Sequence, residues 1–377
     1  MQTENQQQHE EKYDIIIVGA GISGATLAER YATQQNKKVL IIEKRDHIGG
    51  NCYDYHNEDG ILVSKYGAHL FHTNMEDVWE YVNQFSAWRK YEHRVLSSVD
   101  GKLVPVPVNI TTVNAVLGLH IASEDEMKQW LEDNTEKIEN PQNSEEMALS
   151  LVGPVLYEKM FKHYTEKQWS KSPKELAPSV IGRIPVRTNF EDRYFSDVHQ
   201  AIPAEGYTKI FEKMLDHPNI TVRLNTDYLE MKDELKGYEK LFFTGPIDQF
   251  FGYKHGKKLQ YRSLKFVFET HDQEFFQSNS VINYPNEHEY TRIVEYKHFT
   301  GQKHEKTTIS KEFPTWEGEP YYPVPSKENL ELFDKYQQEA KEAEKENIHF
   351  VGRLANYKYF NMDQAFKNAL DLYKSLS

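Results

Sequence analysis

A glycine-rich turn near the N-terminus carries the chemistry that is easiest to recognise. Residues 19–24 read GAGISG, between the apolar run YDIIIVG and a stretch with helical periodicity. Gly19 permits a tight turn, Gly21 lets the backbone approach a pyrophosphate, and Gly24 allows a helix to pack closely on a strand. Glu43 ends the next apolar run, where a carboxylate can accept hydrogen bonds from a ribose. The pattern predicts a dinucleotide-binding site.

A second glycine pair follows that acid in the stretch EKRDHIGGN, residues 43–51. The fingerprint at residues 19–24 alone does not separate FAD from NAD. The pair Gly49-Gly50 resembles the second motif of FAD-linked Rossmann flavoproteins, in which the chain runs beside the cofactor's phosphates. Taken by itself, the pair is also compatible with a simple turn.

Three arginines in one short segment could hold a phosphorylated ligand. Arg183, Arg187 and Arg193 lie in RIPVRTNFEDR, and a solvated charged surface is the simpler interpretation. His69 and His72 form a His-x-x-His pair, but no acid or cysteine stands in register, so we expect no metal. The sequence has no Gly-x-Ser-x-Gly motif of a serine hydrolase.

Composition narrows the class of protein. The 377 residues carry a formal charge of −13, which argues against a nucleic-acid binder because phosphate contacts need a basic face. No apolar run is long enough to cross a membrane, and the polar N-terminus does not resemble a signal peptide. The single cysteine, Cys52, excludes an internal disulfide and fits a reducing compartment. We therefore expect a soluble cytoplasmic protein that binds neither membrane nor nucleic acid.

The elements that must position these residues can be placed from periodicity. Residues 13–43 predict a βαβ unit of a parallel sheet, and residues 123–169 predict helices. The stretches LKFVFET and TRIVEYKHF, between residues 258 and 311, predict antiparallel strands. Near the C-terminus a charged amphipathic helix, the buried strand IHFVGRL and a closing helix follow one another. Strand, glycine and helix recur at both ends, so the dinucleotide-binding domain should be discontinuous.

Further motifs resemble one family along almost the whole folded chain. The sequence is similar to the bacterial UDP-galactopyranose mutases in KYGAHLFHTN (65–74), YTEKQW (164–169), RIPVRTNFEDRYFSD (183–197), PAEGYTKIFEKML (203–215), FTGPID (243–248), YRSLKF (261–266), YTRIVEYKHF (290–299), EPYYPVP (319–325) and FVGRLANYKYFNMDQA (350–365).

The resemblance implies an α/β fold: a discontinuous Rossmann-like FAD-binding domain with an inserted helical domain and an antiparallel β-sheet domain. The expected FAD-binding domain spans residues 13–85, 205–255 and 340–377. Residues 108–182 form the helical domain with a mobile substrate lid. Residues 86–107, 183–204 and 256–335 form the sheet domain, and residues 1–12 a disordered tail.

The family resemblance also implies the reaction. Members are FAD-dependent isomerases that interconvert UDP-galactopyranose and UDP-galactofuranose for cell-wall polysaccharide biosynthesis. Reduced flavin N5 attacks the anomeric carbon and forms a flavin–sugar iminium intermediate, with no net redox change. The resemblance further implies a homodimer and an external flavin reductant. The alternatives are the same chemistry on UDP-N-acetylgalactosamine, a flavin amine-oxidase-like oxidoreductase, and a non-catalytic sugar-nucleotide binder.

The resemblance assigns residue roles by matching motif positions. The expected catalytic residues are Arg183, Arg292 and His72, with the two arginines clamping the diphosphate. The remaining substrate-binding matches are Tyr164, Thr165, Trp169, Tyr194, Asn283, Glu312, Tyr322 and Tyr359. The cofactor-binding matches are Gly19, Gly21, Ser23, Gly24, Glu43, Lys44, Gly50, Asn51, His69, Leu70, Arg353, Phe360, Asn361, Met362, Asp363, Gln364 and Ala365.

One position departs from the family pattern. Many members have Tyr-x-Asp-Met near the C-terminus, where this chain has Tyr359, Phe360, Asn361 and Met362. A neutral amide at Asn361 lowers the negative charge close to the diphosphate and the flavin. Any role that requires a carboxylate there is therefore in doubt.

Overall fold

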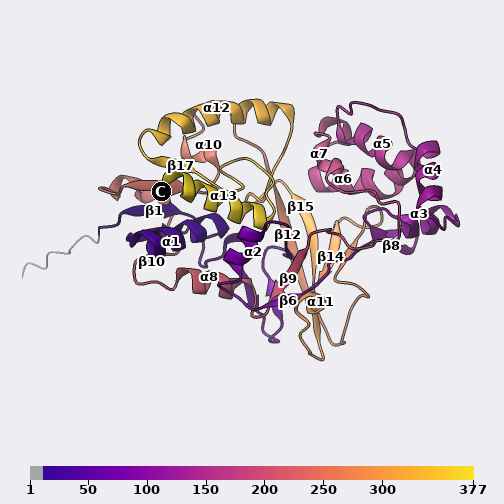
Figure 1. Cartoon of the computed structure of the whole chain (residues 1–377), viewed down its shortest axis with the longest axis horizontal. Helices are drawn as coiled ribbons and strands as arrows, with labels where there is room; N and C mark the ends of the chain where they lie inside the picture. Colours follow the sequence, from indigo (N-terminus) through magenta and orange to yellow (C-terminus); the bar gives the residue numbers. More distant parts are fainter. Residues whose placement is uncertain (1–11) are drawn as a thin grey trace, which may run out of the picture.

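The computed structural model describes residues 12–377 and contains a five-stranded parallel sheet, on the left in Figure 1. The predicted tail therefore lies outside the described residues, except for Lys12. The strand order is β10-β2-β1-β11-β17, with bounds β10 Ile220–Arg223, β2 Val39–Ile42, β1 Ile15–Val18, β11 Lys240–Phe243 and β17 Ile348–Phe350. Three distant stretches of sequence thus supply one sheet. Strands β1 and β2 pair in parallel, which confirms the βαβ unit predicted for residues 13–43.

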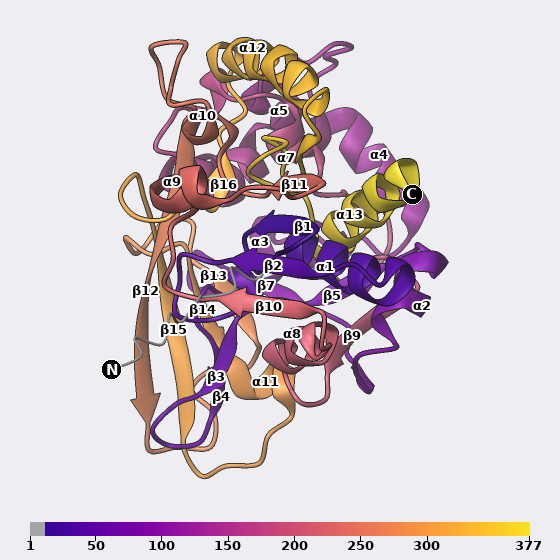
Figure 2. The ribbon, with the colours of Figure 1, turned by 90° about the vertical axis from the view of Figure 1, so that its left-hand side faces the viewer.

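Helices cover both faces of this sheet, which explains its unbroken apolar strands. Ile15 and Ile17 of β1 face a core built with α1 (Ile22–Gln35), α8 (Tyr207–Leu215) and α13 (Met362–Leu376). Ile16, which alternates with them, faces the other core, and Figure 2 shows α12 on that side. There α12 (Lys327–Glu344) packs with α10 (Ile247–Phe250), while α9 (Tyr228–Met231) and η4 (Lys232–Glu234) flank the sheet.

A seven-stranded, largely antiparallel sheet lies beside the parallel one. Its order is β16-β12-β15-β14-β13-β7-β8, with bounds β16 Tyr322–Pro323, β12 Tyr261–His271, β15 Thr307–Thr315, β14 Arg292–Glu295, β13 Val281–Asn283, β7 Val95–Val99 and β8 Lys102–Val106. The strand predicted through residues 291–299 ends at Glu295, and Tyr296–Thr300 form helix α11. The helix ends at Gly301, whose φ is +66°, and its Tyr296 hydroxyl lies 2.8 Å from Ser310 Oγ.

Two small sheets connect these layers. The order β5-β9-β6 joins Phe71–Thr73, His199–Pro203 and Trp88–Lys90, and β3 (Asp54–His56) pairs with β4 (Leu62–Ser64). Strands β6 and β9, which we assigned to the large antiparallel sheet domain, thus pair in a separate sheet with β5. Helix α2 (Glu76–Val82) follows β5, and η1 (Gly50–Cys52) follows the glycine pair.

Helices form a separate lobe at one end of the molecule (Figure 1). The lobe contains α3 Ile110–Leu117, α4 Glu124–Asn134, α5 Ser144–Leu156, the π-helical turn η2 Tyr157–Lys162, α6 His163–Trp169, η3 Pro173–Glu175 and α7 Ser179–Gly182. The α/β fold with an antiparallel sheet is therefore as predicted. The predicted boundary between residues 335 and 340 falls inside α12, whose buried face packs on α10 and β17. In the described part of the chain, no helix has the length and apolarity that a membrane crossing requires.

Candidate active site

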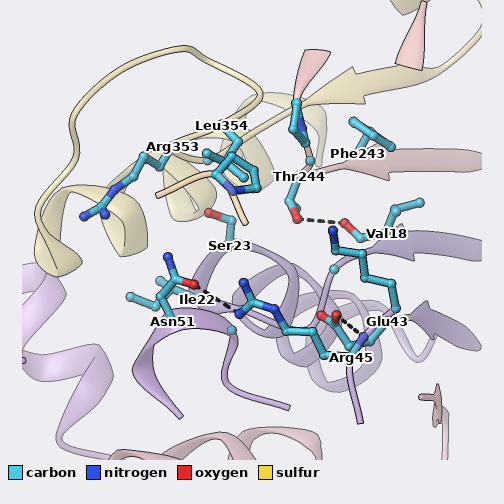
Figure 3. Close-up of a pocket in the computed structure, with 18 of the residues that line it drawn as sticks. Val18, Ile22, Ser23, Glu43, Arg45, Asn51, Phe243, Thr244, Arg353 and Leu354 are labelled. Carbon is cyan, nitrogen blue, oxygen red and sulfur yellow. Dashed lines mark hydrogen bonds between the residues drawn. The ribbon is translucent and has the colours of Figure 1, made fainter. Parts of the chain in front are cut away.

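A cavity opens at the carboxyl ends of β1, β2 and β11, where open α/β sheets bind ligands (Figure 3). Its walls come from residues 18–23, 42–52, 226–229, 243–249, 319–320 and 352–365, together with His69. The N-terminal glycine turn, the C-terminal segment and the middle of the chain therefore meet around one space. Much of the predicted cofactor site lies in this lining: Gly19, Gly21, Ser23, Glu43, Lys44, Gly50, Asn51, His69, Arg353, Phe360, Asn361, Met362 and Ala365.

Two glycines of the turn, Gly19 and Gly24, have no room for a side chain. Gly19 has a φ of +104°, and a Cβ there would lie 2.1 Å from Thr244 Oγ1. A Cβ on Gly24 would lie 1.9 Å from the Gly19 carbonyl oxygen. Helix α1 starts directly after Gly21, and no side chain caps its first amides. These amides and the helix dipole are therefore available to an anion at the cavity.

The Gly49-Gly50 pair is more than a turn, because it packs against the first glycine motif. Both glycines have positive φ, +86° and +54°. A Cβ on Gly50 would lie 2.9 Å from Gly21 Cα, and the Gly49 amide donates to the Ala20 carbonyl over 2.8 Å. Two glycine-rich segments thus contact each other in the cavity wall. Because they carry no side chains there, a diphosphate could approach their backbone closely.

Two backbone amides hold the Glu43 side chain at the end of β2, where we predicted a ribose-binding carboxylate. One carboxylate oxygen accepts the Ala20 amide at 2.8 Å, and the other accepts the Arg45 amide at 2.9 Å. Each oxygen keeps a lone pair for a further donor, such as a ribose hydroxyl. Arg45 Nη1 donates to Asn51 Oδ1 at 3.0 Å, so the residues after Glu43 are tied to the glycine pair (Figure 3).

The opposite end of the cavity is lined by neutral groups around one arginine. His69 Nδ1 lies 2.8 Å from the Gly67 carbonyl oxygen, and burial lowers its pKa to about 4, so the ring is neutral at physiological pH. Burial raises the pKa of Cys52 to about 12, which keeps the thiol protonated. Arg353 Nη2 donates to the Phe360 carbonyl at 2.5 Å, just before α13 begins. These features fit a flavin at this end of the cavity.

Four predicted cofactor residues, Gly24, Leu70, Asp363 and Gln364, do not line the cavity. Gly24 packs against the Gly19 carbonyl, and Leu70 packs into the core beneath the helical lobe. Asp363 is buried in the first turn of α13, and Gln364 Oε1 accepts the Asn361 amide at 3.0 Å. Gly24, Leu70 and Asp363 thus lie beneath the cavity lining, whereas the exposed Gln364 caps the start of α13.

A buried ion pair marks the predicted substrate region. Arg292 Nη2 donates to the Tyr164 hydroxyl at 2.7 Å, and Arg292 Nε lies 3.2 Å from Glu312 Oε2. The two charged residues are register partners on β14 and β15. Burial raises the pKa of Glu312, and Arg292 only partly offsets that effect. Tyr164, Arg292 and Glu312, which lie in separate parts of the sequence, therefore make direct contact.

Tyrosine rings and two further arginines form a second cluster. The rings of Tyr322 and Tyr359 stack at 5.1 Å, and the Arg183 guanidinium lies 4.4 Å from the Tyr359 ring. Arg353 lies 5.1 Å from the same ring, on the C-terminal segment. Burial raises the pKa of Tyr359, but Arg183 and Arg353 outweigh it and the net shift is downward. Two cations and two phenols converge here, and such groups can donate hydrogen bonds to an anion.

The other predicted substrate residues lie around these clusters. Trp169, at the end of α6, is buried against Leu176 and Val324, and Thr165 is buried one turn earlier. Asn283 Oδ1 is buried and has no hydrogen-bond partner. The Tyr194 ring lies 5.8 Å from that of His93, a buried neutral histidine that sequence reasoning missed and whose pKa burial lowers to about 3.

The His72 side chain contacts an aspartate and an aromatic ring. Its Nδ1 lies 3.0 Å from Asp197 Oδ2, and its ring stacks on Phe195 at 3.6 Å. Within residues 12–377 no group of three histidine, cysteine or acidic side chains is placed to hold a metal ion.

Sequence reasoning missed one wall of the cavity. Residues 226–229, the segment after β11 and the pair Glu319 and Pro320 all line it. Thr244 donates to the Val18 carbonyl at 2.7 Å and so joins two neighbouring strand ends (Figure 3). The motif FTGPID, which follows a buried strand, could have indicated this wall, because the ends of parallel strands converge.

Fold and site together define a flavoprotein-like enzyme on a Rossmann-type dinucleotide-binding domain. The UDP-galactopyranose mutase family model matches residues 159–359, and that of an NAD(P)-binding Rossmann-like domain matches residues 17–85. The chain is 40% identical to a dTDP-fucopyranose mutase of Escherichia coli, covering 95% of this chain and 96% of the relative. It is also 40% identical to a probable UDP-galactopyranose mutase of Klebsiella pneumoniae, over 95% of this chain and 93% of the relative.

A solved structure of reduced UDP-galactopyranose mutase has the same fold, with a TM-score of 0.76 at 16% identity, over 97% of this chain and 94% of the other. The chain belongs to the UDP-galactopyranose mutase family, and it is an isomerase. The oxidoreductase alternative is therefore set aside.

Proposed function

We propose that the chain binds FAD in the cavity and isomerises UDP-galactopyranose and UDP-galactofuranose. The observation that carries the proposal is the convergence of Arg183, Arg292 and Arg353 with a stack of tyrosines beside a cavity that fits a dinucleotide. When bound and reduced, FAD supplies the nucleophilic nitrogen for an isomerisation without net redox change. The protein supplies position and charge.

The first role of the arginines and tyrosines is to bind the diphosphate of the nucleotide sugar. The diphosphate anchors the substrate and is also part of the leaving group. Arg183 and Arg292 are placed to clamp its negative charge, and the hydroxyls of Tyr322 and Tyr359 can donate to its oxygens. Tyr194, Tyr164, Thr165 and Trp169 bound the space in which we place the uridine. The loss of diphosphate from the sugar is favoured because the clamp stabilises the charge that leaves.

The second task is to keep the reacting centre free of competing chemistry. The neutral ring of His69 and the protonated thiol of Cys52 put no charge beside the flavin. The Cys52 thiol is also not a nucleophile in its protonated state. Glu312 is fixed by Arg292 at the base of the site, and Asn283 offers a free carbonyl oxygen to a sugar hydroxyl. Asn361 contributes an amide where many relatives have an acid, so its role is hydrogen bonding.

A second candidate substrate is dTDP-fucopyranose. The observation in its favour is that the relatives named for the two substrates are equally identical to this chain. The substrates differ by a thymine methyl, the ribose 2′-hydroxyl and the sugar 6-hydroxyl, so hydrogen bonds to those hydroxyls decide the preference. UDP-N-acetylgalactosamine, with its larger 2-substituent, is a third substrate to compare.

The test is an anaerobic assay of the purified yellow protein with each nucleotide furanose, with and without dithionite. We expect conversion to the pyranose only with reduced flavin and without stoichiometric consumption of reductant, and a higher kcat/KM for UDP-galactofuranose. A higher kcat/KM for the dTDP sugar would transfer the assignment to the second candidate. Flavin oxidation that matches product formation one for one would contradict an isomerase mechanism.

Several family properties accompany this proposal. They are a homodimer, a cytoplasmic location, an external flavin reductant, a product used in cell-wall polysaccharides, a mobile lid in residues 108–182, and the three-domain division given above. The parallel sheet, the seven-stranded sheet and the helical lobe support the division, apart from β6 and β9 and the boundary inside α12. The resemblance supports the rest.

A further inference from the structure

The loop between β15 and β16 forms one rim of the cofactor cavity. It comprises residues 316–320, Trp316 to Pro320, and its last two residues line the cavity. It comes from the antiparallel sheet, whereas the facing wall, Glu43 to Arg45, comes from the end of the parallel strand β2. The rim therefore joins two separate sheets.

The loop is anchored at both ends to the adjacent strand β12. The Arg262 guanidinium lies 4.4 Å from the Trp316 ring, and the Ser263 hydroxyl donates to the Glu319 carbonyl. The Tyr321 amide donates to the Arg262 carbonyl at 3.0 Å, directly after the loop. Its backbone position is thus fixed by β12 and does not depend on the cofactor cavity.

The Glu319 side chain crosses the rim to the opposite wall. Glu319 Oε2 lies 2.9 Å from Lys44 Nζ and 3.6 Å from Arg45 Nη2. Arg45 also lies 4.5 Å from the Tyr66 ring, and that ring lies 6.0 Å from the ring of Tyr321. Ion pairs and neighbouring tyrosine rings therefore close this side of the cavity, next to Glu43.

A carboxylate gains nothing from the phosphates of a dinucleotide, so its position at this rim needs another reason. The two cations that follow Glu43 provide it, because each pairs with Glu319 across the opening. We propose that Glu319, Lys44 and Arg45 form a clasp over the adenosine half of the bound cofactor, and that the clasp slows cofactor release. The proposal rests on FAD binding, as proposed above.

The expected effect is kinetic and modest. The Lys44 and Glu319 side chains are 49% and 42% exposed, and half-exposed ion pairs are weak. We expect Glu319→Gln to release FAD about two- to five-fold faster than the wild-type holoenzyme after dilution, measured by the rise in flavin fluorescence. At about 1 M KCl, where charges are screened within about 3 Å, the difference between the two proteins should shrink.

A double-mutant cycle separates the clasp from general loosening of the loop. If the ion pair acts as a unit, Lys44→Gln combined with Glu319→Gln releases FAD no faster than the faster single variant. Strictly multiplicative effects would overturn the clasp. The matched control is Glu239→Gln, because Glu239 is 48% exposed and pairs with Lys37 at 2.6 Å far from the cavity lining. It should release FAD at the wild-type rate.

The outcomes distinguish this inference from the function on which it rests. A wild-type protein that holds no flavin would contradict the proposed function. A wild-type protein that binds FAD and isomerises its substrate, while Glu319→Gln releases FAD at the wild-type rate, would contradict the clasp alone. Slower release from Glu319→Gln would also overturn it, since Glu319 would then repel the cofactor.

Discussion

At the scale of single residues, the site depends on charges that are paired inside the protein before a ligand arrives. Glu312 is almost fully buried, and burial pushes the pKa of its carboxyl upward. Arg292 is the cation beside it, yet about a third of the Arg292 side chain remains exposed to meet a ligand. One guanidinium thus compensates a buried acid and remains available for a diphosphate.

This double role makes Arg292→Ala costly in two separate ways. We expect turnover to fall by at least about 100-fold, because a contact to the diphosphate is lost, while FAD stays bound. The unfolding free energy should fall by about 1–3 kcal/mol, because a buried carboxylate loses its partner. Steady-state kinetics, flavin absorbance and thermal unfolding measure the three quantities. Retained turnover would contradict the assigned role.

The pH dependence of the stability loss identifies Glu312 as its cause. Without Arg292, the folded-state pKa of Glu312 rises further above the unfolded value. The folded protein then binds the proton more tightly, and this contribution is lost as the pH rises through the folded-state pKa. The stability deficit of Arg292→Ala should therefore grow with pH. The double variant with Glu312→Gln should remove that pH dependence without restoring turnover.

At the scale of elements, the cofactor site is made by two backbone segments that touch. The turn before α1 and the glycine pair that leads into η1 approach so closely that a Cβ on Gly50 would lie 2.9 Å from Gly21 Cα. Neither segment is long, so the precision comes from the buried strands β1 and β2 that precede them. Such a site tolerates loss of a side-chain contact better than gain of a methyl group.

Gly50→Ala tests this contact. The new Cβ would lie 2.9 Å from Gly21 Cα, so the two turns must separate, and we expect FAD affinity to fall by at least about ten-fold. Fluorescence titration of the apoprotein with FAD measures it. Gly60→Ala is the matched control, because Gly60 also has a positive φ, +77°, but a Cβ added there would meet nothing within 4 Å. Equal affinities in the two variants would show that backbone strain, not the contact, governs binding.

The elements also show what the sequence could and could not predict. The glycine turn and the buried strands were predictable because their reasons are local, in steric demand and apolar periodicity. Helix α11 was missed because Tyr296 and Phe299 look like strand residues, and their place in a helix depends on distant partners such as Ser310. Glu319 was missed for the same reason, since its partners Lys44 and Arg45 are remote in sequence.

At the scale of the whole molecule, one cavity joins parts of the chain that are far apart. Its wall contains the end of β2, the segment after β11, the 316–320 loop and the start of α13. A ligand that contacts all of these opposes their separation. Binding to the folded state alone stabilises a protein by RT ln(1 + [L]/Kd), which is about 2.7 kcal/mol at 100-fold excess over Kd.

Removal of FAD should therefore lower the unfolding temperature of the entire chain and not of one lobe. Because the parallel sheet, the antiparallel sheet and the C-terminal segment all contribute to the wall, we expect a single unfolding transition in the holoprotein that shifts downward in the apoprotein. Differential scanning calorimetry at several FAD concentrations measures this shift, with AMP as a control ligand that fills only the adenosine end. AMP should restore part of the stability, since it reaches Glu43 but not the segment before α13. If the helical lobe unfolds separately at the same temperature with and without FAD, its stability is not coupled to the cofactor.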